Sequence, residues 1–352
     1  MRHKKGYLVA FLLLLAIGVA HAQELQMDGQ QAARNYNQLV ADIAANAGVS
    51  RVVFNDYPVP LDKLDKLKDA FPDIEFEYSI SFARKKYRST AEKANIYAHK
   101  VTNDNQFSEL CSVLRYLPGL KELTAKNSTL TFDQLEKLRE LMPDMHVTTN
   151  IRIGRRALRT DLTAFSTRKA YYSNRYSSDD FRGVKYTDGL LALDIGHNAV
   201  TDLDFLYDVP KLRILILADN QITDLTPIAA LPDLEYLEIF KNPVTDLSPL
   251  AGLENLIDLN MTFCQVTDYT PLLGLKKLDR LWIGENPYTD EDLLMLAEAL
   301  PDCTISTDCV VRSRGGGRGL APTANGWRQG HSRYLQIVRI FQKAKYEEFK
   351  VK

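Results

Sequence analysis

Side chains that can bind cations or backbone groups recur with a 22-residue period between positions 190 and 302. An asparagine fills one slot in four of the five copies, and a Thr-Asp pair follows three residues after that slot. Hard cations need six or more converging oxygens, so we expect each aspartate to cap free backbone N–H groups instead of binding a metal. We expect the asparagines to form a structural ladder that satisfies backbone groups of neighbouring coils. The ladder comprises Asn198, Asn220, Asn242 and Asn286, with Cys264 in the remaining slot.

The common catalytic motifs are missing from the chain. There is no Gly-x-Ser-x-Gly, no His-Glu-x-x-His and no Cys-x-x-Cys, and four histidines outside the N-terminal segment lack metal-ligand spacing. The Gly-rich stretch 315–319 is not framed by a strand and a helix, so it is not a phosphate loop. We therefore predict a protein that is not an enzyme and that holds no metal and no cofactor. A catalytic site assembled from distant residues stays open.

The 22-residue period is the strongest signal in the sequence. A fixed period of this kind indicates stacked identical units, each too small to bury its own apolar face. The leucine slots are expected to point inward and to stack into one continuous core. The third copy reads Leu234, Leu237, Ile239, Asn242, Val244, Thr245, Asp246, Leu247, Pro249, Leu250 and Leu253, and similar residue types return one period before and one period after it.

A longer unit occurs three times. Segments 49–76 and 120–147 align without a gap at a 71-residue offset, and a third copy spans 278–305. Each copy predicts a strand, a turn, a helix with apolar spacings of three and four, then Pro-Asp and a second strand. The stretches 83–106 and 154–180 are basic and rich in tyrosine. We expect them to be strand-and-loop connections between modules.

The repeat Leu-x-x-Leu-x-Leu-x-x-Asn, followed by Ile/Val-Thr-Asp-Leu-x-Pro-Leu, resembles the 22-residue leucine-rich repeats of bacterial internalins. The chain is also similar, end to end, to secreted leucine-rich repeat proteins of gut-type bacteria. The resemblance implies an α/β solenoid with a curved parallel sheet on its concave side and short helices or 3-10 turns on its convex side. The longer strand-helix-strand modules at the N-terminus and the lack of a wall-sorting motif depart from internalins, and they leave host-cell invasion unsupported.

Binding in such a solenoid takes place on strand positions that alternate with the leucines and line the concave sheet. Adjacent strands lie about 4.8 Å apart, so we expect one exposed aromatic and apolar patch with charged neighbours, which is the anatomy of a protein interface. The alternative is that repeat 5 and the C-terminal tail cover the patch internally. The predicted binding residues are Asp194, Ile216, Tyr236, Glu238, Phe240, Lys241, Asp258, Phe263, Arg280 and Trp282.

The C-terminal tail is basic, whereas the body of the chain is acidic. Residues 312–352 carry ten Lys or Arg against two Glu, although the formal net charge of the whole chain is −1. We predict a Gly-rich linker over 312–330 and a basic amphipathic helix over 331–352. The helix could bind an anionic membrane surface, or dock with Trp327 onto the acidic solenoid and cap its open end, which we favour. Its apolar face consists of Tyr334, Ile337, Val338, Phe341 and Ala344.

The N-terminus has the layout of a secretory signal peptide. Arg2, Lys4 and Lys5 precede an apolar run over 7–20, and Ala20-His21-Ala22 offers a cleavage site. The run is shorter than the ~20 residues that span a bilayer. We expect residues 1–22 to be removed and the mature chain to be secreted, periplasmic or on the cell surface. The predicted domains are then 23–189, with leucine-rich-repeat-like modules and inserts, and 190–311, with five repeats and a terminal strand, before the linker and helix.

Four cysteines in an exported chain raise the question of disulfides. Cys303 and Cys309 fall in apolar core slots of one extended segment, where six residues span roughly 20 Å. That separation is too large for a disulfide. We expect both to be core residues, and only a tight turn between them would allow a bridge.

These features predict an exported, non-enzymatic protein that recognises another macromolecule, with a protein favoured, through the concave face of residues 190–285. Nucleic acid is not expected for an exported chain whose body is acidic. One alternative is an envelope-associated structural module attached by its basic tail, which would bind an anionic surface through residues 331–352. Another is a hydrolytic or glycan-processing enzyme that uses the Tyr-rich inserts.

Overall fold

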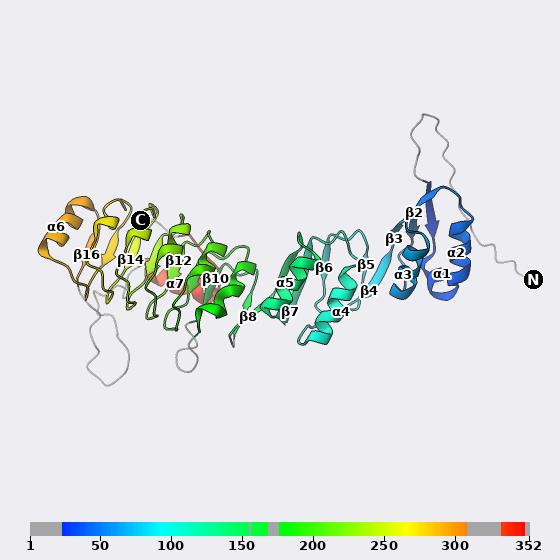
Figure 1. Cartoon of the computed structure of the whole chain (residues 1–352), viewed down its shortest axis with the longest axis horizontal. Coiled ribbons are helices and arrows are strands. Elements are labelled where there is room, and N and C mark those ends of the chain that lie inside the picture. The colour runs from blue at the N-terminus through cyan, green and yellow to red at the C-terminus, as the bar shows by residue number, and fades with distance from the viewer. Residues whose placement is uncertain (1–22, 155, 168–175, 308–331, 349–352) are drawn as a thin grey trace, which may run out of the picture. The chain divides into compact units, whose positions relative to one another are not determined.

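The computed structural model describes residues 23–348 apart from 155, 168–175 and 308–331. The chain divides into two compact units (Figure 1), Met1–Ser128 with Asp133–Thr148 and Thr129–Phe132 with Thr149–Lys352. The predicted signal segment 1–22 and the predicted linker 312–330 lie outside the described residues. In the part of the chain that is described, no helix is long and apolar enough to cross a membrane.

The first unit consists of short sheets flanked by helices. Strands β1, β2 and β3 form a parallel sheet, β4 and β5 form an antiparallel hairpin, and β6 pairs in parallel with β7. The elements are β1 (Gln23–Met27), α1 (Gly29–Arg34), α2 (Tyr36–Ala44), β2 (Val49–Phe54), α3 (Leu61–Ala70), β3 (Glu75–Glu77), β4 (Ser79–Phe82), β5 (Lys85–Arg88), β6 (Lys93–Asn95), α4 (Asp104–Leu114), β7 (Glu122–Leu130), α5 (Phe132–Leu141) and β8 (His146–Ile153), of which β7, α5 and β8 reach into the second unit.

The second unit contains a parallel sheet of seven strands in the order β10-β11-β12-β13-β14-β15-β16. Each of the four strands β11–β14 is followed by a 3-10 turn before the chain returns to the sheet. The elements are β9 (Arg156–Arg159), β10 (Ala164–Ser166), η2 (Ser178–Tyr186), β11 (Ala192–Asp194), η3 (Asp204–Asp208), β12 (Ile214–Ile216), η4 (Thr226–Ala230), β13 (Tyr236–Glu238), η5 (Ser248–Leu250), β14 (Asp258–Asn260), η6 (Thr270–Leu272), β15 (Arg280–Trp282), α6 (Asp290–Ala299), β16 (Thr304–Ser306) and α7 (Ser332–Lys343).

The predicted α/β solenoid is confirmed, and so is the strand-helix-strand order of the three longer units. These units are β2-α3-β3, β7-α5-β8 and β15-α6-β16. The second unit nevertheless includes β9, β10 and η2, which lie before the predicted boundary at residue 190. The reason is that β10 pairs with β11, and that Phe165, Phe181 and Val184 belong to the core of the repeats.

The leucine slots form one core that runs through every repeat. Leu215, Leu237 and Leu259 sit opposite one another on neighbouring strands and are fully buried. Burying a leucine side chain stabilises a fold by about 1.5–3 kcal/mol. Because each coil contributes only a few such residues, the coils are stable only when stacked.

The aspartates of the Thr-Asp pairs begin the 3-10 turns, as the sequence predicts. Each accepts a hydrogen bond from the backbone N–H two residues later, for example Thr226 N to Asp224 Oδ1 at 2.8 Å. The same bond occurs at Asp202, Asp246 and Asp268. The fifth pair differs because a full helix follows it. There Thr289 caps α6 by accepting a hydrogen bond from Asp292 N, and Asp292 accepts one from Thr289 N in return.

Each asparagine amide connects its own coil to the coil before it. Asn242 donates to the carbonyls of Leu217 and Ile239 and accepts from the N–H of Ile222. Asn220 and Asn286 repeat this pattern one repeat before and two repeats after it, and Asn198 accepts from the N–H of Tyr176. The turn itself is made by the residue before each asparagine slot, which has a φ between 55° and 62° in all five copies. These residues are His197, Asp219, Lys241, Phe263 and Glu285.

Cys264 interrupts the ladder. Its Sγ donates weakly to the carbonyl of Ile239 at 3.4 Å, but a thiol offers no amide oxygen to the coil before it. The N–H of Val244 therefore bonds to the carbonyl of Asn242, whereas the corresponding N–H in other copies bonds to an asparagine side chain. Burial raises the pKa of the Cys264 thiol to about 12, so the thiol stays neutral and unreactive.

Cys303 is free and partly buried against the repeat core, in agreement with its predicted slot. Its thiol pKa is raised to about 12 by burial. Cys309 lies outside the described residues.

Restoring the ladder is expected to stabilise the second unit. Cys264→Asn replaces the weak thiol donor to the Ile239 carbonyl with an amide donor and offers Val244 N–H the acceptor that other copies have, and one stronger buried hydrogen bond is worth about 1 kcal/mol. Urea unfolding followed by circular dichroism would measure the change in the free energy of unfolding. Asn242→Ala is the matched control, and it should lower stability by about 1–3 kcal/mol because it leaves buried backbone groups unpaired. A Cys264→Asn variant less stable than the wild type would contradict this account of the ladder.

Candidate functional site

The strand side chains that point away from the leucine core form two rows with a 22-residue step. We call the surface that these rows form the concave face. In-register pairing sets the rows directly, since Tyr236 pairs with Asp258 and Glu238 pairs with Asn260. The first row is Ala164, Ala192, Ile214, Tyr236, Asp258, Arg280 and Thr304, and the second is Ser166, Asp194, Ile216, Glu238, Asn260, Trp282 and Ser306.

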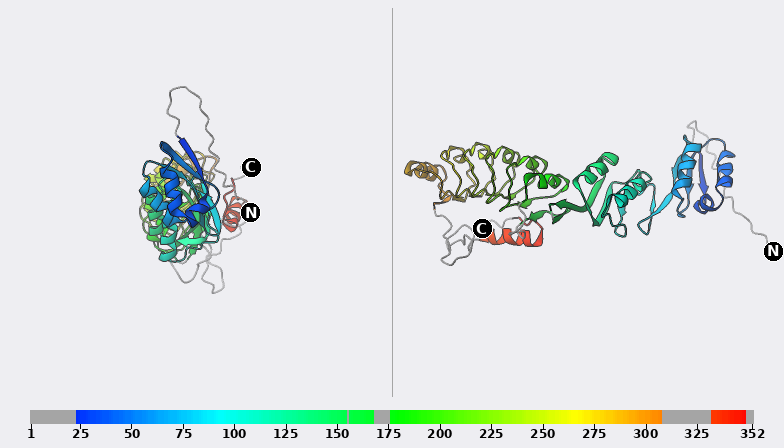
Figure 2. Two further views of the ribbon diagram at one scale, coloured as in Figure 1. Left: turned by 90° about the vertical axis from the view of Figure 1, so that its right-hand side faces the viewer. Right: turned by 60° about the horizontal axis from the view of Figure 1, so that its bottom comes forward.

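Helix α7 covers the concave face (Figure 2). Its residues Ile337 and Ile340 are fully buried, and they form one apolar cluster with Ile216, Tyr236 and Trp282 of the strands. The exposed residues of α7 include Leu335, Arg339 and Lys343, which lie on its other side. The helix is therefore amphipathic as predicted, and its apolar side is satisfied by the repeats.

The predicted binding residues consequently occupy two different environments. Those on the two rows are buried, together with Phe240, so the patch is not exposed as expected. The covering segment is the tail, which was the alternative. Lys241 and Phe263 lie outside the rows because their left-handed backbone turns them toward the rim of the face, where Lys241 is exposed and Phe263 partly exposed. The buried members are Asp194, Ile216, Tyr236, Glu238, Phe240, Asp258, Arg280 and Trp282.

A buried carboxylate ties α7 to the middle of the sheet. Asp258 is fully buried, and its two oxygens accept hydrogen bonds from Arg280 at 2.8 and 2.9 Å. The same oxygens accept from Arg333 of α7 at 2.9 and 3.0 Å, and Arg333 also pairs with Asp279. Two guanidinium groups thus share one desolvated carboxylate. Charge-assisted, bidentate bonds of this kind are the strongest and most geometrically selective available to side chains.

A second anchor holds the chain beyond the C-terminal end of α7. The helix ends at Lys343, Ala344 follows with a φ of 52°, and the backbone N–H of Tyr346 then donates to Thr163 Oγ1 at 2.7 Å. The Tyr346 phenol donates to Glu235 at 3.3 Å, and the Arg213 guanidinium lies 5.3 Å from the Tyr346 ring centroid. Burial raises the pKa of the Tyr346 phenol, so the group remains a neutral donor.

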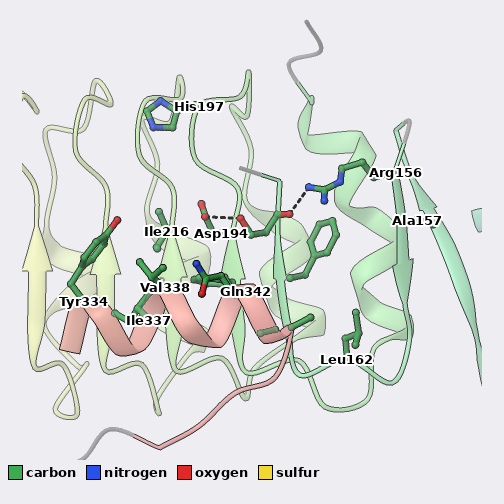
Figure 3. Close-up of a pocket in the computed structure, with 15 residues that line it drawn as sticks. Arg156, Ala157, Leu162, Asp194, His197, Ile216, Tyr334, Ile337, Val338 and Gln342 are labelled. Atoms are coloured by element: carbon green, nitrogen blue, oxygen red, sulfur yellow. Dashed lines mark hydrogen bonds between the residues drawn. The ribbon is translucent and has the colours of Figure 1, made fainter. Parts of the chain in front are cut away.

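Between these anchors, part of the interface is hollow. A cavity of about 790 Å³ lies between α7 and the first strands of the sheet (Figure 3). Apolar side chains such as Phe165, Ile216 and Val338 line most of it. Its polar groups are engaged locally, because Asp194 accepts from Ser166 Oγ at 2.7 Å and Arg156 donates to the Ser166 carbonyl at 2.6 Å.

The rim of the concave face carries a polar trio. Asp219 accepts a hydrogen bond from His197 Nδ1 at 2.9 Å and pairs with Lys241 Nζ at 2.7 Å. The hydrogen bond from His197 and the contacts with Lys241 hold the pKa of Asp219 far below its usual range. These side chains are partly exposed beside α7, so they remain available for contact with another molecule.

The sequence analysis missed the residues that attach the tail. Arg333 shares a helix face with Ile337, four residues later. This spacing could have indicated the contact, because the repeats carry the acidic Asp258 and Asp279 one strand apart. Ile340 and Tyr346 were also missed, although both are buried. The tail lies on the concave face and not at the open end of the solenoid as predicted, and Trp327 lies outside the described residues.

Comparison with known families agrees with this geometry. Residues 210–252 match the family described as Leucine Rich repeats (2 copies). The fold is a leucine-rich repeat solenoid. No curated protein matches the sequence of this chain.

Three solved structures are similar to the chain at low identity. Internalin C2 of Listeria monocytogenes is 21% identical with a TM-score of 0.34, and the match covers 64% of this chain and 88% of that one. The internalin inlF of the same organism is 17% identical with a TM-score of 0.37, covering 78% and 86%. A leucine-rich repeat protein of Leptospira interrogans is 14% identical with a TM-score of 0.31, covering 82% and 90%.

The concave face is thus built to hold a helix through non-covalent contacts. It combines a buried ionic anchor, an aromatic and aliphatic centre and a charged rim. Within the described residues, no group of three or more His, Cys, Asp or Glu side chains is placed to hold a metal ion. The chemistry that this arrangement supports is recognition of another surface.

Removing the ionic anchor is expected to loosen α7. Arg333→Ala leaves Asp258 with one guanidinium partner, and breaking a buried ion pair costs about 3 kcal/mol or more. Trp282 would then gain exposure to water. In a Trp327→Phe background Trp282 is the remaining tryptophan, so its emission should shift to longer wavelength and acrylamide should quench it more strongly. Arg339→Ala on the exposed side of α7 is the matched control and should leave both signals unchanged. Identical spectra for the two variants would contradict the assigned role of Arg333.

Proposed function

We propose that this chain is an exported, non-enzymatic protein that binds another protein through the concave face of its leucine-rich repeats. The observation that carries the proposal is that this face already holds a 12-residue amphipathic helix through aromatic, apolar and ionic contacts. Repeat solenoids use such extended concave surfaces for binding. Aromatic and arginine side chains at the centre, with a polar rim, are typical of protein interfaces.

Export is supported by the sequence of residues 1–22, which combines a charged start, a short apolar core and a small-x-small cleavage site. The absence of known catalytic motifs from the sequence supports a binding role over turnover. A protein partner is favoured over direct attachment to an anionic envelope surface. An amphipathic helix binds a membrane through its apolar face, and the repeats cover that face of α7.

Site-specific cross-linking would test the proposal on the intact mature chain. A photoreactive p-benzoylphenylalanine replaces Lys241 on the rim in one version and Tyr207 of η3 in the other. These two positions are similarly exposed, at 55% for the Lys241 side chain and 53% for Tyr207. Illumination in cell-envelope extracts should attach a protein to the Lys241 position and not to the Tyr207 position, with the partner identified by mass spectrometry. Capture from both positions equally, or from neither, would count against a concave binding face.

A further inference from the structure

Helix α7 contacts the concave face in the way that a separate ligand would. Its N-terminal end is held by Asp258 and Asp279, its middle by apolar contacts, and the residues after it by Thr163 and Glu235. Residues 308–331, which connect it to β16, lie outside the described residues. The contacts of α7 therefore indicate which kind of helix the concave face can bind.

The ionic end of the face selects arginine. Asp258 is fully buried and its carboxylate accepts two bidentate guanidinium groups, of which the sheet itself supplies one through Arg280. Without Arg333, Asp258 would keep the guanidinium of Arg280, and Asp279 would lose its ion pair with Arg333. The planar fork of arginine matches this geometry, whereas the ammonium of lysine would act only as a point charge.

The apolar centre selects a helix with a defined spacing. Ile337 and Ile340 follow Arg333 by four and seven residues, which places all three on one side of the helix. Both isoleucines are at most 1% exposed in the cluster with Tyr236 and Trp282. A ligand helix must therefore present an arginine followed by apolar residues at these positions.

At the end of the concave face near β10, the sheet fits α7 poorly. The sheet presents the small side chains of Ala164 and Ser166 there, and α7 adds Val338, Gln342 and Ala344 to the lining of the cavity. The helix does not fill this end of the face, since an open cavity of about 790 Å³ remains there. That volume lies within the range of pockets that bind ligands. Bulkier side chains on the helix would fill it.

We propose that the concave face recognises an amphipathic helix of a partner protein and that α7 is a replaceable occupant of that site. This inference rests on the proposed function and specifies its partner. The partner helix carries an arginine for Asp258 and Asp279 and apolar residues four and seven positions later. It also carries large apolar or aromatic side chains where α7 has Val338 and Gln342. These side chains fill the cavity, so the partner helix binds more tightly than α7 and displaces it.

The test measures binding of fluorescein-labelled peptides to the full mature chain by fluorescence anisotropy. The probe peptide has the sequence of residues 332–348, and two further peptides carry Arg333→Ala or Gln342→Phe. Three chains are compared: the wild type, a released chain with Arg333→Ala and Ile337→Asp, and a control chain with Arg339→Ala and Leu335→Asp. The control changes match the released changes in type but fall on the exposed side of α7.

We expect the released chain to bind the probe peptide at least about tenfold more tightly than the wild type or the control chain, because its site is vacant. The Arg333→Ala peptide should bind the released chain about tenfold or more weakly, since it lacks the bidentate contact. The Gln342→Phe peptide should bind the released chain about three- to tenfold more tightly by filling the cavity. It should also bind the wild type more tightly than the probe peptide does.

Equal affinity of the released and wild-type chains for the probe would overturn the inference, and so would equal affinity of the Arg333→Ala and unmodified peptides. The Gln342→Phe peptide acts on the unaltered wild type, so it remains informative if the released chain does not fold. Failure of this peptide to bind the wild type more tightly than the probe peptide would also count against the inference. Self-association of the wild type that Arg333→Ala abolishes, measured by sedimentation velocity, would assign the site to α7 of a second copy and overturn the separate partner.

The proposed function and this inference can fail separately. If cross-linking from Lys241 captures a protein and an excess of the Gln342→Phe peptide does not reduce that capture, binding stands and the helix specificity falls. If the peptides bind as expected but no protein is captured, the site accepts helices while the proposed function fails.

Discussion

The structure of the second unit depends on the fact that no single coil can satisfy itself. Each 22-residue coil leaves an apolar edge and several backbone groups that only the next coil can bury or bond. The leucine rows supply the first requirement and the asparagine amides supply the second, since one amide bonds to backbone groups of its own coil and of the coil before it. Because both depend on the same period, the strands pair in strict register and the outward rows of side chains are fixed as a consequence.

That register explains how a small set of contacts can hold α7. Asp258 lies beside Arg280 on the next strand because the two are one repeat apart, and the sheet therefore presents a preformed carboxylate–guanidinium pair. Arg333 of α7 adds a second guanidinium group to the same carboxylate. The aromatic side chains beside it exclude water, which strengthens each charged contact. The docking of α7 on the concave face is thus a product of the same periodicity that builds the core.

Much of this architecture could be predicted from the sequence because it is local or periodic. The strand positions, the capping by Asp224 and its equivalents, and the rows of the concave face all follow from spacing alone. The docking of residues 332–348 could not be placed, because it joins segments far apart in the chain and depends on which face of the sheet has a complementary cavity and charge. The left-handed turn residues also escaped prediction. Lys241 and Phe263 are not residue types that favour a positive φ, and only the asparagine slot after each of them hints at the turn.

The two anchors of α7 have a mechanical meaning as well. One joins the helix to Asp258 on β14, and the other joins the chain just beyond it to Thr163 beside β10, so a rigid rod is fixed at two points along the sheet. In a stacked solenoid each coil contacts only its neighbours. While α7 is bound, the sheet and the helix are joined at both ends of the helix. The strands between the two anchors therefore cannot change their curvature without breaking one of these anchors. The repeats β10–β15 therefore lie within the segment that α7 contacts, whereas β16 extends beyond it.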